Sequence, residues 1–134
     1  MKRFILAICA VALLATTTGC STLADAKAAK GSGTVRVYEK PYDVVWDAVM
    51  ASIKTSGLAL VSDNKGEGTI LAQGAMGAFS YGENVAVFVE DAGGKIKTRV
   101  EIVNKRALAT NITAADWESR LSSAIDQRIK SMPQ

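Results

Sequence analysis

The stretch NVAVFVEDAGGKIKTRVEIV, residues 84–103, determines the fold expected for this chain of 134 residues. Apolar and polar residues alternate on both sides of its centre, and this two-residue period is typical of β-strands. Gly93 and Gly94 at the centre supply the positive φ angles that a tight turn requires. We therefore predict an antiparallel hairpin with one inward and one outward face. The inward side chains are those of Val85, Val87, Val89, Ile96, Thr98, Val100 and Ile102, and the outward ones, which we expect to face water, are those of Lys95, Lys97, Arg99 and Glu101.

Three further strands are expected before this hairpin. Residues 34–39, TVRVYE, alternate about Val35 and Val37, which this period places on a covered face. Residues 58–62 and 69–73 are short apolar runs, and the turn-forming sequence DNKGEG separates them. These two runs therefore predict another hairpin.

Two helices complete the expected elements. The first has Pro41 in its first turn, where the missing N–H is harmless, and ends at Gly57, a residue type common at helix C-termini. The second begins with a variant capping box formed by Thr113 and Asp116. In both segments apolar residues recur at three- and four-residue spacing, which gives each helix one apolar face.

The expected order of elements is β-α-β-β-β-β-α. Because both helices are amphipathic and the later strands form hairpins, we predict an α+β fold, an antiparallel β-sheet with two helices packed on one face. Trp46 and Trp117 are the largest core side chains expected on the helices. Residues 34–134 are sufficient for one domain of this kind.

The first nineteen residues have the layout of a secretory signal. Lys2 and Arg3 precede a run of twelve apolar residues, and small polar residues follow before Cys20. A membrane-spanning helix needs roughly 20 apolar residues, so this run is too short for a permanent anchor. Residues 20–33 are small and polar, and we expect them to form a flexible tether.

The residues around Cys20 resemble the lipobox of bacterial lipoproteins. Thr18 and Gly19 are the small residues that precede the cysteine in that family, and Thr17 stands where an aliphatic residue is usual. The resemblance implies that the Cys20 thiol receives a diacylglyceryl group, with acyl chains such as palmitate, and that Cys20 becomes the mature N-terminus. It also implies that Ser21 permits sorting to the periplasmic face of the outer membrane.

Simple secretion is the alternative to lipid attachment. Ala24-Asp25-Ala26 has the small-x-small form of an ordinary cleavage site, but it lies eleven residues beyond Leu14, far from the apolar run. Cys9 lies within the signal, which leaves Cys20 as the only other cysteine of an exported protein. An unpaired thiol would be exposed to oxidation there, and lipid attachment would remove it.

The helical pattern YxxVWxxV at residues 42–49 and the strand start GTI at residues 68–70, within this element order, resemble the helix-grip domains of BamC, an outer-membrane assembly lipoprotein. The chain also resembles an uncharacterised family of small proteobacterial outer-membrane lipoproteins. The resemblance covers roughly residues 34–132 and implies a helix-grip-like fold. The matching residues are core and turn residues, so the resemblance concerns the fold more than the function.

The composition argues against several classes of function. The chain has 16 Lys and Arg residues, 13 Asp and Glu residues and no histidine, and two of the basic residues lie in the signal. The nearly neutral remainder, with its basic residues scattered, is not typical of a nucleic-acid-binding protein. Without histidine, the usual zinc sites lose a main ligand and histidine-dependent nucleophilic catalysis is excluded. We expect no enzyme activity, no metal and no cofactor.

The segment GAMGAFSYG, residues 74–82, is the candidate contact surface. It places Met76, Phe79 and Tyr81 among three glycines, and large apolar residues in a loop often mark a contact site. Its glycine spacing does not match that of a phosphate-binding loop. The alternative is that these side chains fold back and close one end of the core.

Two functions follow from these features. The first is a membrane-anchored module for protein interaction or envelope assembly, which holds other envelope proteins through the exposed sheet face or the loop at residues 74–82. The alternative is a carrier that binds a small apolar ligand or lipid between helix and sheet. A chain of this length, with many alanines in its core segments, leaves little apolar volume for a cavity of roughly 300 Å³ or more. This favours the first function.

Overall fold

The computed structural model describes residues 21–77, 80–107 and 115–133. Its secondary structure confirms the expected α+β class and the expected order of the main elements. In chain order the elements are α2 (Leu23–Ala28), β1 (Thr34–Tyr38), α3 (Tyr42–Ser56), β2 (Ala59–Asn64), β3 (Thr69–Gln73), β4 (Met76–Gly77), β5 (Ser80–Tyr81), β6 (Glu83–Gly93), β7 (Lys97–Arg106) and α4 (Trp117–Ser131).

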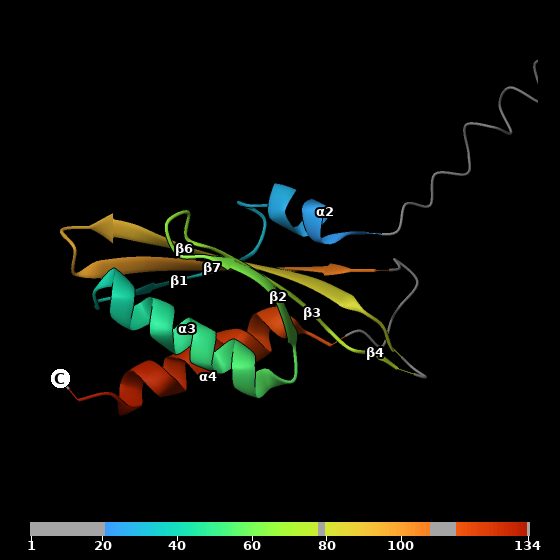
Figure 1. The fold of residues 1–134 in the computed structure, drawn as a ribbon. Helices are drawn as coiled ribbons and strands as arrows, with labels where there is room; N and C mark the ends of the chain where they lie inside the picture. Colours follow the sequence, from blue (N-terminus) through green and yellow to red (C-terminus); the bar gives the residue numbers. More distant parts are fainter. Residues whose placement is uncertain (1–20, 78–79, 108–114, 134) are drawn as a thin grey trace, which may run out of the picture.

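Five strands form one antiparallel sheet in the order β1-β7-β6-β3-β2, with the long β6–β7 hairpin at its centre (Figure 1). Strands β4 and β5 form a separate two-stranded hairpin between β3 and β6. The turn between β6 and β7 has Gly93 at φ 127° and Gly94 at φ 68°, as the glycine pair predicts. No helix among the described residues combines the length and the apolar character that crossing a membrane requires.

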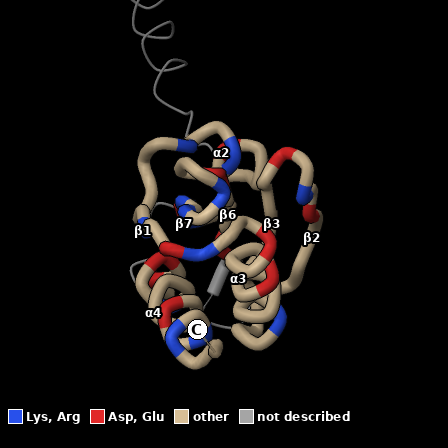
Figure 2. Tube along the Cα trace, turned by 90° about the vertical axis from the view of Figure 1, so that its left-hand side faces the viewer, with Lys and Arg blue, Asp and Glu red and all other residues tan. Residues whose placement is uncertain are grey.

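Helices α3 and α4 lie side by side on one face of the sheet, as expected (Figures 1 and 2). Between them and the sheet lies the main core, which contains Trp46 and Trp117 as expected. The sheet contributes mainly β-branched side chains from β6 and β7 to this core, and their regular alternation matches the pleat. The core residues of these two strands are Val85, Val87, Val89, Val100 and Ile102.

Helix α3 begins and ends where the sequence predicts, whereas α4 begins at a different residue. Helix α3 begins directly after Pro41 and ends at Gly57, which has φ 89°. Helix α4 begins later than expected, because Asp116 is itself the N-cap and its carboxylate accepts a hydrogen bond from the Ser119 N–H at 3.1 Å. Thr113, the expected partner in a capping box, lies outside the described residues.

Strand β1 faces the opposite way from the expectation. Val35 and Val37 are 39% and 57% exposed and lie on the face of the sheet that α3 and α4 do not cover. The alternate residues Thr34 and Tyr38 turn toward α4 instead. Their hydroxyl groups donate hydrogen bonds to carboxylates of α4 at 2.7 and 2.6 Å. At this sheet edge, hydrogen bonds to the carboxylates of α4 therefore determine which face of β1 turns inward.

The segment expected to be a flexible tether, residues 20–33, is packed on the sheet over its described part, residues 21–33. Helix α2 begins with a capping box between Thr22 and Asp25 and lies on the face opposite α3 and α4 (Figure 2). Ala26 is completely buried in a small second core with Ala86, Phe88 and Val103. The physical reason is that alanine lets the helix approach the sheet closely, so that even a narrow apolar stripe is buried.

Two isoleucines provide a matched test of this core. Ile53 of α3 is fully buried, whereas Ile96, which we expected on the inward face, lies in the β6–β7 turn and is 63% exposed. Ile53→Ala should lower the free energy of unfolding by about 2–5 kcal/mol, because it leaves a cavity. Ile96→Ala should change it by less than about 0.5 kcal/mol. Chemical denaturation measures both values, and equal effects would contradict the described packing.

Candidate functional site

The residues singled out from the sequence lie at or near the edges of what the structure describes. Cys20 and Phe79 lie outside the described residues. The backbones of Met76 and Tyr81 pair with each other across the β4–β5 hairpin, and their side chains lie outside the described part of the structure. Of the residues next to Cys20, the structure describes Ser21.

Ser21 is bonded to one end of the sheet, where β3 and β7 end and β6 begins. Its N–H donates to the carbonyl oxygen of Ala107 at 3.1 Å, and its own carbonyl oxygen accepts from Asn84 Nδ2 at 2.8 Å. The Asn84 side chain is buried, and its Oδ1 accepts from Gln73 Nε2 at 2.9 Å. The residue that follows Cys20 is thus held by strands rather than by a loose chain. We call this part of the molecule the anchor end.

The β4–β5 hairpin emerges at the same anchor end (Figure 1). The Gly74 N–H donates to the carbonyl oxygen of Glu83 at 2.8 Å, and the Ala107 N–H donates to that of Gly82 at 3.2 Å. These bonds close the base of the hairpin beside the backbone that holds Ser21. The structure therefore brings Ser21, the residue after Cys20, and the base of the loop at residues 74–82 to one end of the domain.

A cavity of about 310 Å³ opens at the anchor end. It is lined by Ser21, Thr22, Leu23, Gln73, Gly74, Gly82, Glu83, Asn84 and Ala107. Glu83 is buried, and Trp117 Nε1 lies 3.5 Å from its Oε2 at the limit of a hydrogen bond. A Cβ atom on Gly74 would stand 2.4 Å from the same oxygen, so this position has no room for a side chain. The polar side chains of the lining are two hydroxyl groups, two amides and one carboxylate, which suit hydrogen bonding.

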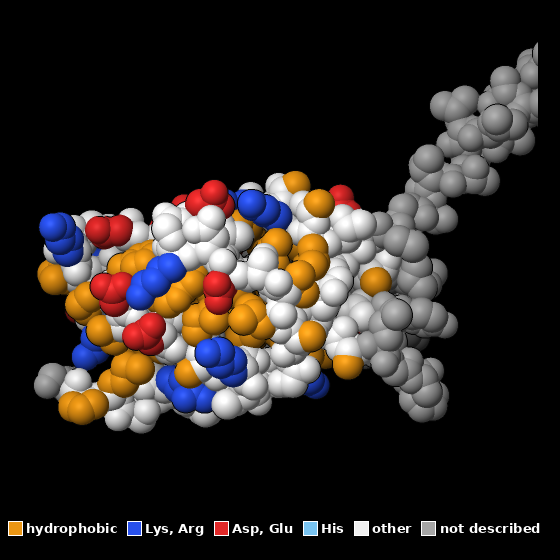
Figure 3. Space-filling model, in the orientation of Figure 1, with side chains coloured by type: hydrophobic (Ala, Val, Ile, Leu, Met, Phe, Trp, Pro, Cys, Tyr) orange, Lys and Arg blue, Asp and Glu red, His pale blue; other side chains and the backbone are white. Residues whose placement is uncertain are grey.

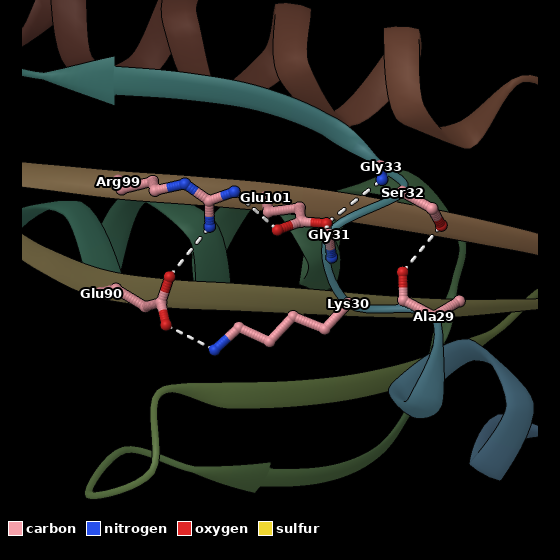
Figure 4. Close-up of polar contacts among 8 residues, drawn as sticks. All are labelled: Ala29, Lys30, Gly31, Ser32, Gly33, Glu90, Arg99 and Glu101. Carbon is pink, nitrogen blue, oxygen red and sulfur yellow. Dashed lines mark hydrogen bonds and ion pairs between the residues drawn. The ribbon is translucent and has the colours of Figure 1, made fainter.

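A second polar cluster lies under the segment that leads from α2 to β1 (Figure 4). Glu101 of β7, expected to face water, is completely buried there. Its carboxylate accepts a hydrogen bond from Arg99 Nη2 at 2.7 Å and one from the Gly33 N–H at 3.2 Å. Nη1 of Arg99 donates to Glu90 Oε2 at 2.9 Å, and Lys30 also pairs with Glu90.

These contacts determine the charge state of the cluster. Burial alone would raise the pKa of Glu101, but the hydrogen bonds from Arg99 and from the N–H groups of Gly33 and Gly31 outweigh it, and the pKa lies below its ordinary value. The hydrogen bond from Lys30 likewise holds the pKa of Glu90 below its ordinary value. Both carboxylates are therefore ionised at neutral pH, and the cluster ties residues 30–33 to the sheet electrostatically.

The sequence contains a signal for this second covered face. Ala86 and Phe88 occupy positions of β6 that alternation assigns to the outward face, yet both are apolar and buried. A strand that is apolar on both faces needs cover on both. Among the described residues, no group of three or more His, Cys, Asp or Glu side chains is placed to hold a metal ion.

No protein-family model and no curated protein sequence matches this chain.

The buried carboxylate makes the stability dependent on pH. Because the pKa values of Glu101 and Glu90 are lower in the folded state, their stabilisation is fully present above the ordinary value of 4.5 and is lost as the pH falls through the folded values. We expect the free energy of unfolding to fall between about pH 5 and pH 3. Glu101→Gln should lower it by about 1–3 kcal/mol at pH 7 and flatten this acid dependence.

Urea denaturation at a series of pH values tests this expectation. The control is Glu39→Gln, since the Glu39 side chain is 82% exposed and its ion pair with Lys97 is long, at 3.5 Å. That variant should retain both the stability and the pH dependence of the unmodified protein within about 0.5 kcal/mol. An identical acid profile for Glu101→Gln and the unmodified chain would contradict the role assigned to Glu101.

Proposed function

We propose that this chain is a non-enzymatic lipoprotein, anchored to the periplasmic face of the outer membrane through a lipidated Cys20, that acts as a protein-interaction or envelope-assembly accessory module. The signal-like layout of residues 1–19 and the lipobox-like residues before Cys20 support the anchor. Each buried methylene of an acyl chain adds about 0.8 kcal/mol of membrane affinity, and two or more chains give stable attachment.

One observation carries the proposal: Ser21 is hydrogen-bonded to the end of the sheet from which the β4–β5 hairpin emerges. If Cys20 carries the lipid, that hairpin is held within a short distance of the membrane surface. An apolar loop in this position suits contact with another envelope protein at the same surface. The proposed contact residues remain Met76, Phe79 and Tyr81.

The surface supports a protein partner more than a nucleic acid. On the face shown in Figure 3, basic and acidic side chains are interspersed with hydrophobic ones, and neither sign of charge forms a continuous stripe. Most of the ion pairs of the described residues join partly exposed side chains of opposite charge, such as Lys65 with Asp43 at 2.8 Å. Nucleic-acid-binding surfaces usually concentrate basic residues instead.

The carrier of an apolar ligand is the alternative function, and the packing favours it less. The layer between the two helices and the sheet is filled by the large side chains of the main core, including those of Trp46, Ile53 and Ile125. The cavity of about 310 Å³ lies outside that layer, at the anchor end. The order of elements agrees with a relation to BamC-like helix-grip domains, and we retain that relation as part of the proposal.

The lipid anchor is tested directly by mass spectrometry. Protein extracted from membranes with detergent should begin at Cys20 and carry a diacylated or triacylated modification on that residue. Cys20→Ser should remove the modification and move the chain out of the membrane fraction. A soluble chain that begins at Lys27, as ordinary cleavage after Ala26 would produce, would refute the anchor.

The contact loop is tested by replacing Met76, Phe79 and Tyr81 together with Ser. If the loop binds a partner, the melting temperature should stay within about 3 °C of the unmodified value, while envelope proteins no longer copurify. If the side chains close the core, the melting temperature should fall by roughly 4–8 °C for each kcal/mol lost. Ile96→Ser, at an exposed turn on the opposite end of β6 and β7, is the control. A stable triple variant that keeps every partner would exclude the loop as the contact.

A further inference from the structure

Residues 21–33 cross the face of the sheet opposite α3 and α4, and we call them the strap. The strap is attached at three places: Ser21 to β6 and the end of β7, helix α2 to the second core, and residues 30–33 to the charged cluster. Gly31, with φ 96°, lets the chain turn from α2 toward β1. Each attachment involves few residues. The contacts are hydrogen bonds at Ser21, apolar packing at α2 and charged groups at residues 30–33.

The strap adds nothing to the main core. All buried members of that core lie within residues 45–129, and the strap meets only the second core. Its contribution there consists of Ala26, fully buried, and Ala29, partly buried. Helix α2 has only six residues, and isolated helices shorter than about 12–15 residues are marginal in water. The helix therefore depends on docking, so that docking and folding of the strap occur together.

Part of the surface beneath the strap is polar. The hydrogen bonds from Arg99 to Glu101 and Glu90 are made within the β6–β7 hairpin and do not involve the strap. Removal of the strap would newly expose only a few apolar side chains, chiefly those of Phe88 and Val103. On the opposite face the same two strands present an unbroken apolar surface to the helices. Loss of its cover would therefore expose much less apolar surface on the face under the strap than on the face under the helices.

We propose that the strap is detachable: it undocks and unfolds from the back of the sheet while the rest of the domain stays folded. In the docked state Ser21 is held at the anchor end. In the released state residues 21–33, extended at up to 3.3–3.6 Å per residue, span as much as roughly 45 Å. The release itself depends only on the described contacts. The consequence that the domain then stands further from the membrane rests on the proposed lipid attachment at Cys20.

Hydrogen–deuterium exchange of the full-length protein in detergent micelles tests the release. Amides of the strap should exchange at least tenfold faster than those of β6 and β7, with a weaker dependence on urea, as local opening requires. Ala26→Glu places a charge in the buried second core and should bring the strap close to the exchange rate of an unfolded chain. In that variant β6 and β7 should stay protected at least 100-fold.

Ala24→Glu is the matched control, because Ala24 lies on the exposed side of the same helix. It should leave strap exchange within about twofold of the unmodified protein. A milder second variant is Lys30→Met, which removes the pair with Glu90 and the ammonium group 5.3 Å above the Phe88 ring. It should speed exchange of the strap several-fold, with Lys54→Met as its control. The proposal is overturned if the strap and β6 exchange at one rate, or if Ala26→Glu also unprotects or unfolds the β6–β7 hairpin.

The height change is measured separately by energy transfer. A dye on Ala92→Cys, at the far turn of the β6–β7 hairpin, serves as donor to a headgroup-labelled acceptor lipid in phosphatidylethanolamine–phosphatidylglycerol vesicles that hold the full-length protein. Transfer should change with Ala26→Glu and stay constant with Ala24→Glu. Constant transfer in both variants would refute the height change. Failure of the chain to attach through Cys20 would refute the anchor, while the exchange experiment still decides whether the strap detaches.

Discussion

The central β6–β7 hairpin is apolar on both faces, and the rest of the structure follows from the need to cover both. One face carries a continuous row of valines and Ile102, which the pair of amphipathic helices covers. The other face carries Ala86, Phe88 and Val103, an area small enough for one short helix. Because burial of apolar area is the main favourable term in folding, both layers form around this hairpin.

The smaller layer explains the buried Glu101. When residues 29–33 pass over β7 to reach β1, they shield this carboxylate from water, and an unpaired charge there would be strongly unfavourable. Arg99 on the same strand and the N–H groups of Gly31 and Gly33 supply the compensating hydrogen bonds. Because Arg99 lies on the same strand as Glu101, this ion pair does not depend on the strap, which lowers the cost of burying the charge.

The sequence predicts an element correctly where a single hydrophobic period dominates the segment. It fails where other contacts outweigh that period or where the period is weak. The alternation of residues 84–103 and the glycine pair identify the central hairpin, and the two helical stripes identify α3 and α4. Alternation places Val35 and Val37 on the wrong face, because hydrogen bonds from β1 to α4 prevail over alternation at this sheet edge. The pattern does not reveal the strap, because Ala26 and Ala29, the two alanines that pack on the second core, form too small an apolar stripe to stand out from a flexible linker.

The small side chains of α2 also determine how strongly the strap binds the sheet. A linker that contains larger apolar residues would bind the sheet more strongly and become part of one cooperative unit, whereas a purely polar linker would not dock. Alanine on the buried side of α2, with ion pairs such as Lys27 to Glu67 at its exposed side, lies between these limits. Ion pairs at this exposure contribute little, and alanine buries little area, so the docked and released states are expected to differ by a small free energy. If Cys20 carries the proposed lipid, the segment between the anchor and the folded domain can then change length without any change in the core.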